Sequence, residues 1–446
     1  MQSIDWSKKN IAKIGTEPII TEESFPCLVD GDMNGFNEST KKQFKNLREK
    51  IEPWLTALFQ SEHLSLLIGT GLTTGVTSIA KCKAPGMEIP SEINIYRDEI
   101  KKRATESANK MNRGAANCED FYRCAFEVLA GMKIINDPQT NTFNNELNSA
   151  IISFINKIIN GETLFRNKLE ESSVEAELAL LYLKSFLMSF SSRTASRERL
   201  NIFTTNYDRF IEYALDDAGI FWLDRFFGKL KPIFRNIRLE LDYHYNPPGI
   251  RGEPRYVEGV VRFTKLHGSI DWAQEKHEII RMPWPFGYAS SVNPLNGNAL
   301  DKIIIYPNAA KDIETTFYPY AELFRDFASS ICRPNSVIVT YGYGFGDDHI
   351  NRVLSDALTI PSAHLCVISF DNASGRIENF LKNQNFAQVT LLMGNHFGEL
   401  KNLVDNYLPK PAIDRISKRM AEIKKIRKEA DVENTNEEAG IEESTL

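Results

Sequence analysis

Four short segments place glycines or polar residues directly after hydrophobic runs that are typical of buried β-strands. They are "GTGLTTG" (69–75), "TTNYD" (204–208), "KLHGS" (265–269) and "YGYGFGDDH" (341–349). The second and third segments contain an amide (Asn206), a carboxylate (Asp208) and an imidazole (His267), which can orient a substrate, hold a polar group and accept a proton. Ligands bind beyond the carboxyl ends of the strands in open α/β sheets, so four such loops together favour one binding site.

Each segment alone also has a purely structural interpretation. "GTGLTTG" lacks the lysine of a phosphate-binding P-loop and the spacing of a dinucleotide fingerprint, so it is either a phosphate cradle at a helix N-terminus or a tight turn. A single histidine such as His267 is often a packed core residue. The glycines of 341–349 can serve a loop that only needs positive φ angles.

The elements around these segments alternate between strand and helix patterns over residues 63–400. This alternation predicts an α/β fold with a doubly wound, mostly parallel sheet. Residues 97–198 contain few strand signals and several stretches with apolar residues at helical spacing, which predicts a large helical insertion packed over the ligand edge of the sheet. We therefore divide the chain into an N-terminal, partly helical segment (1–60), a main domain (61–410), and a polar helix with a disordered acidic tail (411–446).

Composition excludes several classes of protein. The net charge of −6 over 446 residues comes from the last sixteen residues, which hold six acids and no base, so direct nucleic-acid binding is not expected. The polar N-terminus and the lack of a long apolar run predict neither a signal peptide nor a membrane span, and we expect a cytoplasmic protein. Signatures of serine hydrolases, kinases and zinc hydrolases are missing from the sequence.

No metal site is expected from the sequence. The six cysteines form no CxxC pair, so no zinc is expected. "DGDMNGFNESTK" (30–41) imitates a calcium loop, but Lys41 stands where the closing carboxylate is needed. We interpret this stretch as a surface turn before a helix.

The ordered set "GTGLTTG", "TTNYD", "LHGS" and "YGYGFGDDHIN" resembles the sirtuin-like domain of prokaryotic proteins over residues 60–400. The resemblance implies a Rossmann-like fold with a helical insertion and NAD as the ligand. It assigns the phosphate cradle to Gly69, Thr70 and Gly71, and nicotinamide-ribose chemistry to Asn206 and His267. The other implied NAD contacts are nicotinamide recognition by Asp208 and adenosine contacts by Gly342, Tyr343, Asp371 and Asn372.

The sequence departs from the deacylating sirtuins at two places. It lacks their two CxxC pairs, and "MEIPSEINIYRD" keeps only Ile89 and Pro90 of the loop that reads "GIPDFR" in those enzymes. The chain looks more like the zinc-free branch, which consists largely of NAD-hydrolysing proteins of antiphage defence. The expected function is therefore an NAD glycohydrolase, an NADase that uses NAD as its substrate and depletes it in abortive infection. The alternatives are a non-catalytic NAD or ADP-ribose-binding module, a protein deacylase and an ADP-ribosyltransferase.

The resemblance also implies partners. Stand-alone members of this branch are paired with a HerA-like hexameric ATPase, so we expect a ring-shaped homo-oligomer that docks such an ATPase. Apolar residues recur at three- or four-residue steps in 36–60 and offer one surface for assembly, although they can equally form an ordinary core face.

Overall fold

The computed structural model describes most of the chain. The described residues are 4–15, 17–20, 37–84, 88–110, 116–193, 197–236, 242–245, 255–287 and 318–410. Residues 30–36 of the calcium-like stretch, and the predicted polar helix and acidic tail at 411–446, lie outside them.

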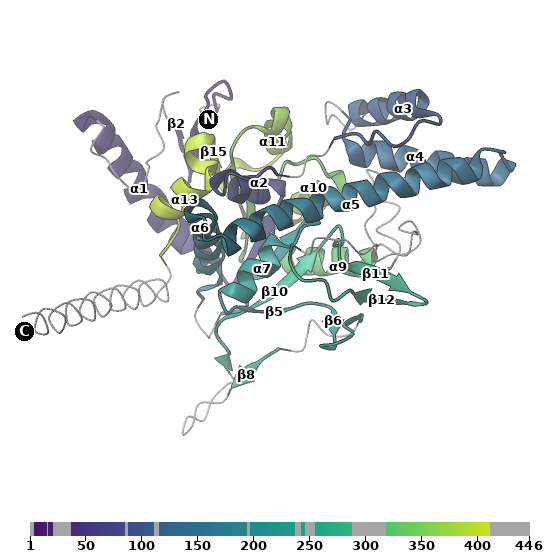
Figure 1. Cartoon of the computed structure of the whole chain (residues 1–446). Helices are drawn as coiled ribbons and strands as arrows, with labels where there is room; N and C mark the ends of the chain where they lie inside the picture. The colour runs from purple at the N-terminus through teal and green to yellow at the C-terminus, as the bar shows by residue number, and fades with distance from the viewer. Residues whose placement is uncertain are drawn as a thin grey trace, which may run out of the picture.

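The centre of the fold is a sheet to which the described residues contribute nine strands (Figure 1). In spatial order its strands are β2 (Glu17–Ile20), β1 (Ile11–Ile14), β15 (Val389–Met393), β14 (His364–Ser369), β13 (Ser336–Tyr341), β3 (His63–Ile68), β4 (Asn201–Thr204), β10 (Val260–Lys265) and β5 (Phe221–Leu223). All neighbouring pairs from β15 to β5 are parallel, whereas β1 pairs antiparallel with both β15 and β2. The prediction of an α/β fold with a mostly parallel sheet is confirmed.

The strand order reverses next to β3. From β3 the chain moves to β4, β5 and β10 on one side, and it later returns to β13, β14 and β15 on the other side. Such a reversal opens a crevice at the carboxyl ends of the two strands that flank it, here β3 and β13. The loops at 69–71 and 342–347 follow these two strands directly.

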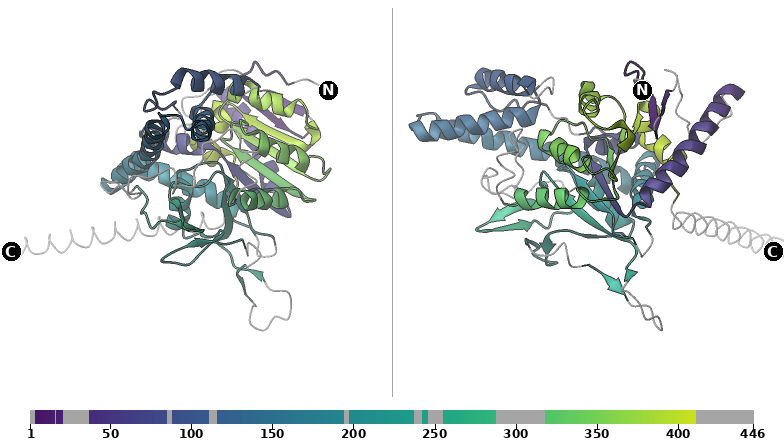
Figure 2. Two further views of the ribbon diagram at one scale, coloured as in Figure 1. Left: turned by 90° about the vertical axis from the view of Figure 1, so that its right-hand side faces the viewer. Right: turned by 180° about the vertical axis from the view of Figure 1, so that it is seen from behind.

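Helices cover both faces of the sheet (Figure 2) because the strand side chains alternate between two hydrophobic cores. In β3, Leu64, Leu66 and Ile68 join one core, and Leu67 joins the other. The helices that pack into the first core are α1 (Glu38–Phe59), α2 (Thr70–Ile79), α6 (Val174–Ser191), α7 (Phe210–Asp217), α12 (Asn395–Gly398) and α13 (Leu400–Asn406). The helices of the second core are α9 (Tyr320–Ile331), α10 (Asp348–Ala357) and α11 (Arg376–Leu381).

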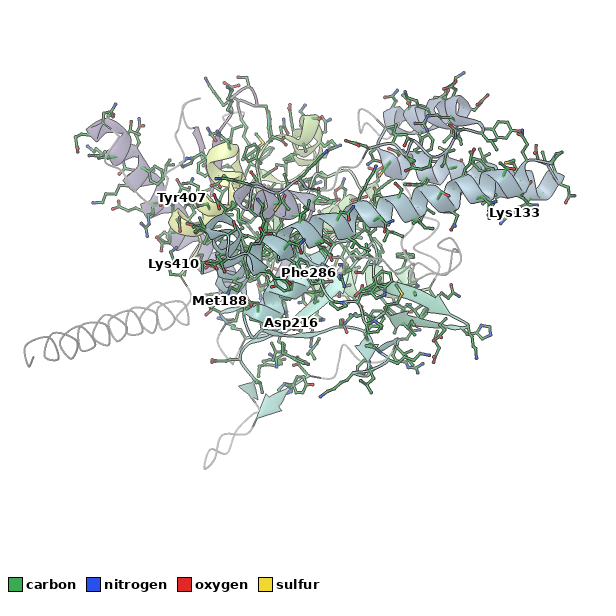
Figure 3. All side chains as sticks on the ribbon, viewed as in Figure 1. Lys133, Met188, Asp216, Phe286, Tyr407 and Lys410 are labelled. Atoms are coloured by element: carbon green, nitrogen blue, oxygen red, sulfur yellow. The ribbon has the colours of Figure 1, made fainter. Side chains whose placement is uncertain are left out.

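The described residues between α2 and β4, in the region predicted as a helical insertion, form four helices. Three of them, α3 (Arg97–Lys110), α4 (Cys118–Ile135) and α5 (Thr140–Glu170), form a third core together with Tyr207 and Ile270 from the main sheet's loops. The far end of α4, near Lys133, extends away from the sheet (Figure 3). The fourth helix, α6, packs against α2 inside the first core, so this part of the insertion belongs to the main fold.

Two features were not predicted. Strand β1 of the N-terminal segment lengthens the central sheet, and a small antiparallel sheet follows β5. The strands of the small sheet are β6 (Phe226–Phe227), β7 (Ile233–Phe234), β11 (Trp272–Glu275) and β12 (Glu278–Arg281). Strands β8 (His244–Tyr245) and β9 (Arg255–Tyr256) pair as a two-stranded antiparallel ribbon.

Among the described residues, no helix has both the length and the hydropathy that a membrane span needs.

Candidate functional site

A pocket of about 300 Å³ lies at the carboxyl ends of the central strands, within the size range of small-molecule sites. It collects residues from the loops after β3, β4, β10 and β13 and from the N-termini of α4 and α11. The lining residues are Gly69, Thr70, Asn117, Glu119, Asp120, Thr205, His267, Tyr343, Gly344, Gly346, Asp347 and Arg376. The sheet therefore brings together the four segments on which the sequence analysis began.

The glycines after β3 and β13 meet each other. The amide of Gly71 donates to the carbonyl of Gly342 (3.0 Å), and the amide of Gly69 donates to the carbonyl of Tyr341 (3.0 Å). A Cβ on Gly71 would lie 2.5 Å from the Cα of Gly342, so the two loops touch backbone to backbone. Two of the three residues of the expected phosphate cradle thus use their amides within the protein. Thr70 lines the pocket, and its amide is not engaged by another described residue at the N-terminus of α2.

Asn206 lies just behind the pocket and is 1% exposed. Its Nδ2 donates to the carbonyl of Gly69 (3.1 Å) and to Oγ1 of Thr73 (3.1 Å). Its Oδ1 is buried and has no hydrogen-bond partner among the described residues. The side chain therefore ties the loop after β4 to the start of α2, while its neighbour Thr205 is the residue that lines the pocket.

Asp208 is also buried behind the pocket. Its Oδ2 accepts from Oγ1 of Thr73 (2.8 Å), and its Oδ1 accepts from the amide of Phe210 (3.3 Å). Burial raises the pKa of this carboxyl group, although the charge of Lys265 and the bond from Thr73 act in the opposite direction. Asp208 is not among the residues that line the pocket.

Two contacts, one phenolic and one ionic, fix the loop that carries Asn206 and Asp208. The hydroxyl of Tyr207 donates to Oε1 of Glu119 (2.9 Å) at the start of α4. The guanidinium of Arg209 donates to Oε2 of Glu162 (2.6 Å) on α5, a carboxylate with no exposed surface. Because both acidic partners come from the helical insertion, that insertion positions the loop after β4.

His267 lines the pocket and is 3% exposed. Its Nε2 lies 3.9 Å from Oδ1 of Asp347, the N-cap residue of α10. Two other rings lie near the imidazole. The centroid of the His267 ring is 6.1 Å from that of Tyr207 and 5.8 Å from that of His349. Gly268 follows with a φ of 80°, a conformation that favours glycine and turns the chain directly after the imidazole.

The predicted adenosine contacts separate in the structure. Tyr343 lines the pocket, whereas Gly342 supports the loop through its contact with Gly71. Asp371 accepts from the amide of Ala373 (2.7 Å), and Asn372 accepts from the amide of Glu378 (3.1 Å), so both organise the turn before α11. Neither of these two residues lines the pocket.

The sequence analysis missed several lining residues. Arg376 begins α11 and donates from Nε to the carbonyl of Gly344 (2.7 Å), which places a cation beside the glycine-rich loop. Asn117, Glu119 and Asp120 come from the N-terminus of α4, where Asn117 and Asp120 form a capping box. The sequence "NCED" is typical of a helix start, but nothing in it indicates that this helix begins at the pocket.

The fold and the site define a mixed α/β protein with a polar pocket at the switch point of a mostly parallel sheet. Residues 200–388 match the family model described as the SIR2-like domain. This range is less than half of the chain, and it includes Asn206, Asp208, His267 and the loop of 342–347 but not the glycine loop at 69–71. The match therefore supports a relationship to the sirtuin-like family for residues 200–388.

The remaining comparisons add less. A structure of a Sir2 variant with a deacetylated p53 peptide and 3′-O-acetyl ADP ribose is 12% identical to this chain, with 80% of this chain and 98% of that chain covered. Its TM-score of 0.28 is too low to transfer the position of any residue. No curated protein matches the chain.

Proposed function

We propose that this protein is an NAD glycohydrolase that cleaves NAD to nicotinamide and ADP-ribose. The observation that carries the proposal is the position of His267, which lines a pocket at the switch point of the sheet and lies within the region that matches the SIR2-like domain. SIR2-like domains use NAD, and a pocket at this place in an open α/β sheet suits a nucleotide.

The chemistry follows from the charges of the substrate. The bond between C1′ of the ribose and nicotinamide breaks with its electron pair going to the nicotinamide nitrogen, which leaves an oxocarbenium-like ribose. The carboxylates of Glu119, Asp120 and Asp347 line the pocket and favour this positive charge. Water then adds to C1′, and the imidazole of His267 accepts the proton that the water loses.

The opposite charge of the substrate also has a partner. The diphosphate of NAD needs a cation or free amides, and Arg376 and the amide of Thr70 supply both at the pocket. These two groups follow β14 and β3, whereas His267 follows β10 on the other side of β4. We therefore assign the diphosphate to the side of β14 and the nicotinamide ribose to the side of β10.

Asn206 has a positioning role in this scheme. Its hydrogen bonds to Gly69 and Thr73 hold the loop after β3. Its buried Oδ1 can accept a hydrogen bond from a water molecule or a ribose hydroxyl if the loop opens on binding.

The same geometry favours a rival function, a non-catalytic module that binds NAD or ADP-ribose, because the amide predicted to orient the reacting groups points into the protein. A deacylase or ADP-ribosyltransferase has no specific observation in its favour.

Measurement of free nicotinamide separates catalysis from binding. Purified protein is incubated with NAD, and we expect nicotinamide and ADP-ribose in equal amounts. His267→Gln should lower the rate by about 100-fold or more, the range of general base catalysis. The matched control His277→Gln changes an exposed histidine in the β11–β12 turn and should keep the wild-type rate. Tight NAD binding without any nicotinamide release would contradict the proposed enzyme and favour the non-catalytic binding module.

The biological setting is part of the proposal and rests on the sequence resemblance. We propose that the protein acts in the cytoplasm in antiphage defence by depleting NAD, as a ring-shaped homo-oligomer with a HerA-like hexameric ATPase. Size-exclusion chromatography with light scattering tests the assembly, and co-purification with the ATPase tests the partner. A fully active monomer across the micromolar range would contradict the ring.

A further inference from the structure

We propose that His267, Asp347 and His349 form a binding site for a divalent first-row transition-metal ion, with zinc as the probe. One ligand atom from each of the three side chains lies within 4.8 Å of the others. Two imidazoles and one carboxylate are a common ligand set for such ions, and hard cations such as Mg²⁺ prefer oxygen ligands alone. This site is separate in kind from a cysteine zinc ribbon, which the sequence lacks.

The fold holds the three ligands in place from two directions. His267 follows β10, while Asp347 and His349 flank the start of α10 after β13. Both histidines are buried, at 3% and 9% exposure, and the ring of His349 packs against Phe324 with centroids 4.6 Å apart. Because these rings have little freedom, an ion would meet a largely formed site.

The distances require only a small adjustment. Zinc binds nitrogen and oxygen ligands at about 2.0–2.2 Å, which places the ligands of a tetrahedral site about 3.4 Å apart. Nε2 of His267 and Oδ1 of Asp347 are 3.9 Å apart, and the full set lies within 4.8 Å. The side chain of Asp347 is 18% exposed and can approach an ion by rotation about its side-chain bonds, and small shifts of the two rings close the remaining gap.

The charge of the pocket supports a cation. Among the described lining residues, three carboxylates (Glu119, Asp120 and Asp347) face one guanidinium (Arg376). A bound divalent ion would neutralise part of this negative charge, and the pocket gives it access to solvent and to further oxygen ligands. Position and charge thus both point to His267, Asp347 and His349.

The consequence for activity rests on the proposed function. A neutral imidazole has one nitrogen lone pair, so a His267 that binds a metal ion cannot also accept a proton. The bound ion should therefore inhibit NAD cleavage, and removal of the ion should restore it. Metal binding itself does not need NAD. A failure of the metal-site proposal can therefore be distinguished from a failure of the proposed NAD cleavage.

The test measures zinc binding without NAD. The full chain is treated with EDTA, exchanged into a non-chelating buffer and titrated with ZnCl₂ by calorimetry, with melting temperature as a second readout. We expect one zinc ion per chain with micromolar or tighter affinity, a higher melting temperature, and no comparable response to MgCl₂. A wild-type protein that binds no zinc would overturn the proposal.

Variants assign the ligands. Asp347→Asn and His349→Gln should each weaken zinc binding by more than about 100-fold, beyond the loss typical of changes outside the coordinating set. The controls are Asp348→Asn, which changes the exposed neighbour of Asp347, and His277→Gln, and both should bind zinc as the wild type does. Circular dichroism checks the fold, and Asp347→Asn decides the result if His349→Gln does not fold. Wild-type affinity in folded Asp347→Asn would contradict the site.

Discussion

Gly71 and Gly342 are in backbone contact across the switch point of the sheet, with the amide of Gly71 donating to the carbonyl of Gly342 at 3.0 Å. A Cβ on Gly342 would lie 2.6 Å from the Cα of Gly71, and Gly342 has a φ of 59°. The two loops that begin the pocket therefore have no room for a side chain at either position. Their closeness explains why glycine occurs here without any appeal to a bound phosphate.

The first prediction concerns this contact. Gly342→Ala and Gly71→Ala should each lower the melting temperature and weaken NAD binding, because the two loops must separate to admit a methyl group. Gly131→Ala is the matched control, since this glycine lies inside α4 with no atom within 4 Å of its added Cβ. The control should raise stability by about 0.5–1 kcal/mol through helix propensity. Thermal unfolding measures the stability, and titration measures the affinity for NAD. Unchanged NAD affinity in Gly342→Ala would show that the contact between the two glycines does not shape the NAD site.

The second prediction concerns Asn206. Asn206→Ala should reduce NAD cleavage by about 100-fold or more because the start of α2 loses its tie to the loop after β4. It should also cost about 0.5–1.5 kcal/mol of stability, since the carbonyl of Gly69 loses one of its two donors and keeps only the amide of Leu72. Asn94→Ala, at an exposed position, should leave both quantities unchanged. Nicotinamide release and urea denaturation are the measurements, and wild-type cleavage by folded Asn206→Ala would remove the residue from the scheme.

The third prediction concerns the buried ion pair between the helical insertion and the loop after β4. Glu162→Gln should lower the free energy of unfolding by about 3 kcal/mol, because Arg209 would keep a buried charge without its partner. Burial raises the pKa of Glu162, which reflects the cost of holding this carboxylate away from water. Glu170→Gln breaks a pair on the same helix in which Glu170 is exposed and Arg166 is half-buried, and it should change stability by less than about 0.5 kcal/mol. Equal losses in the two variants would mean that the buried pair adds no more to stability than the pair of Arg166 and Glu170.

The fourth prediction concerns pH. Burial lowers the pKa of His364 to about 4, and the charge of Lys13 acts in the same direction. The folded state therefore disfavours the protonated ring, so this contribution to stability is complete above pH 6.5 and is lost as the pH falls toward 4. The loss should reach at most about 3 kcal/mol, because one pKa unit corresponds to about 1.4 kcal/mol.

Unfolding curves between pH 7 and pH 4 test this expectation. His364→Gln should show a shallower fall in stability over that interval than the wild type. His277→Gln should keep the wild-type slope, since that histidine is exposed. Parallel slopes in all three proteins would show that His364 is protonated as easily in the folded chain as in the unfolded one.

Much of the sheet was determined by local sequence. The apolar runs of β3, β4, β10 and β13 are too short for helices and end at glycines or polar residues, so the sequence predicts each of them as a strand. The helical spacing within 97–198 likewise predicts α4, α5 and α6. Because parallel strands place their carboxyl ends at one edge, the sequence also predicts that His267 and the loop at 342–347 meet in one pocket.

The tertiary structure alone decided which side chains face that pocket. Asn206 and Asp208 stand in the predicted loop, but their hydrogen bonds to Thr73 turn them into the protein, whereas Arg376 and Glu119 reach the pocket from helices far along the chain. The direction of a loop side chain depends on the partners that the packed chain offers, and such partners carry no periodic signal in the sequence. Strand periodicity fixes where a loop lies, and long-range hydrogen bonds fix which of its groups can meet a substrate.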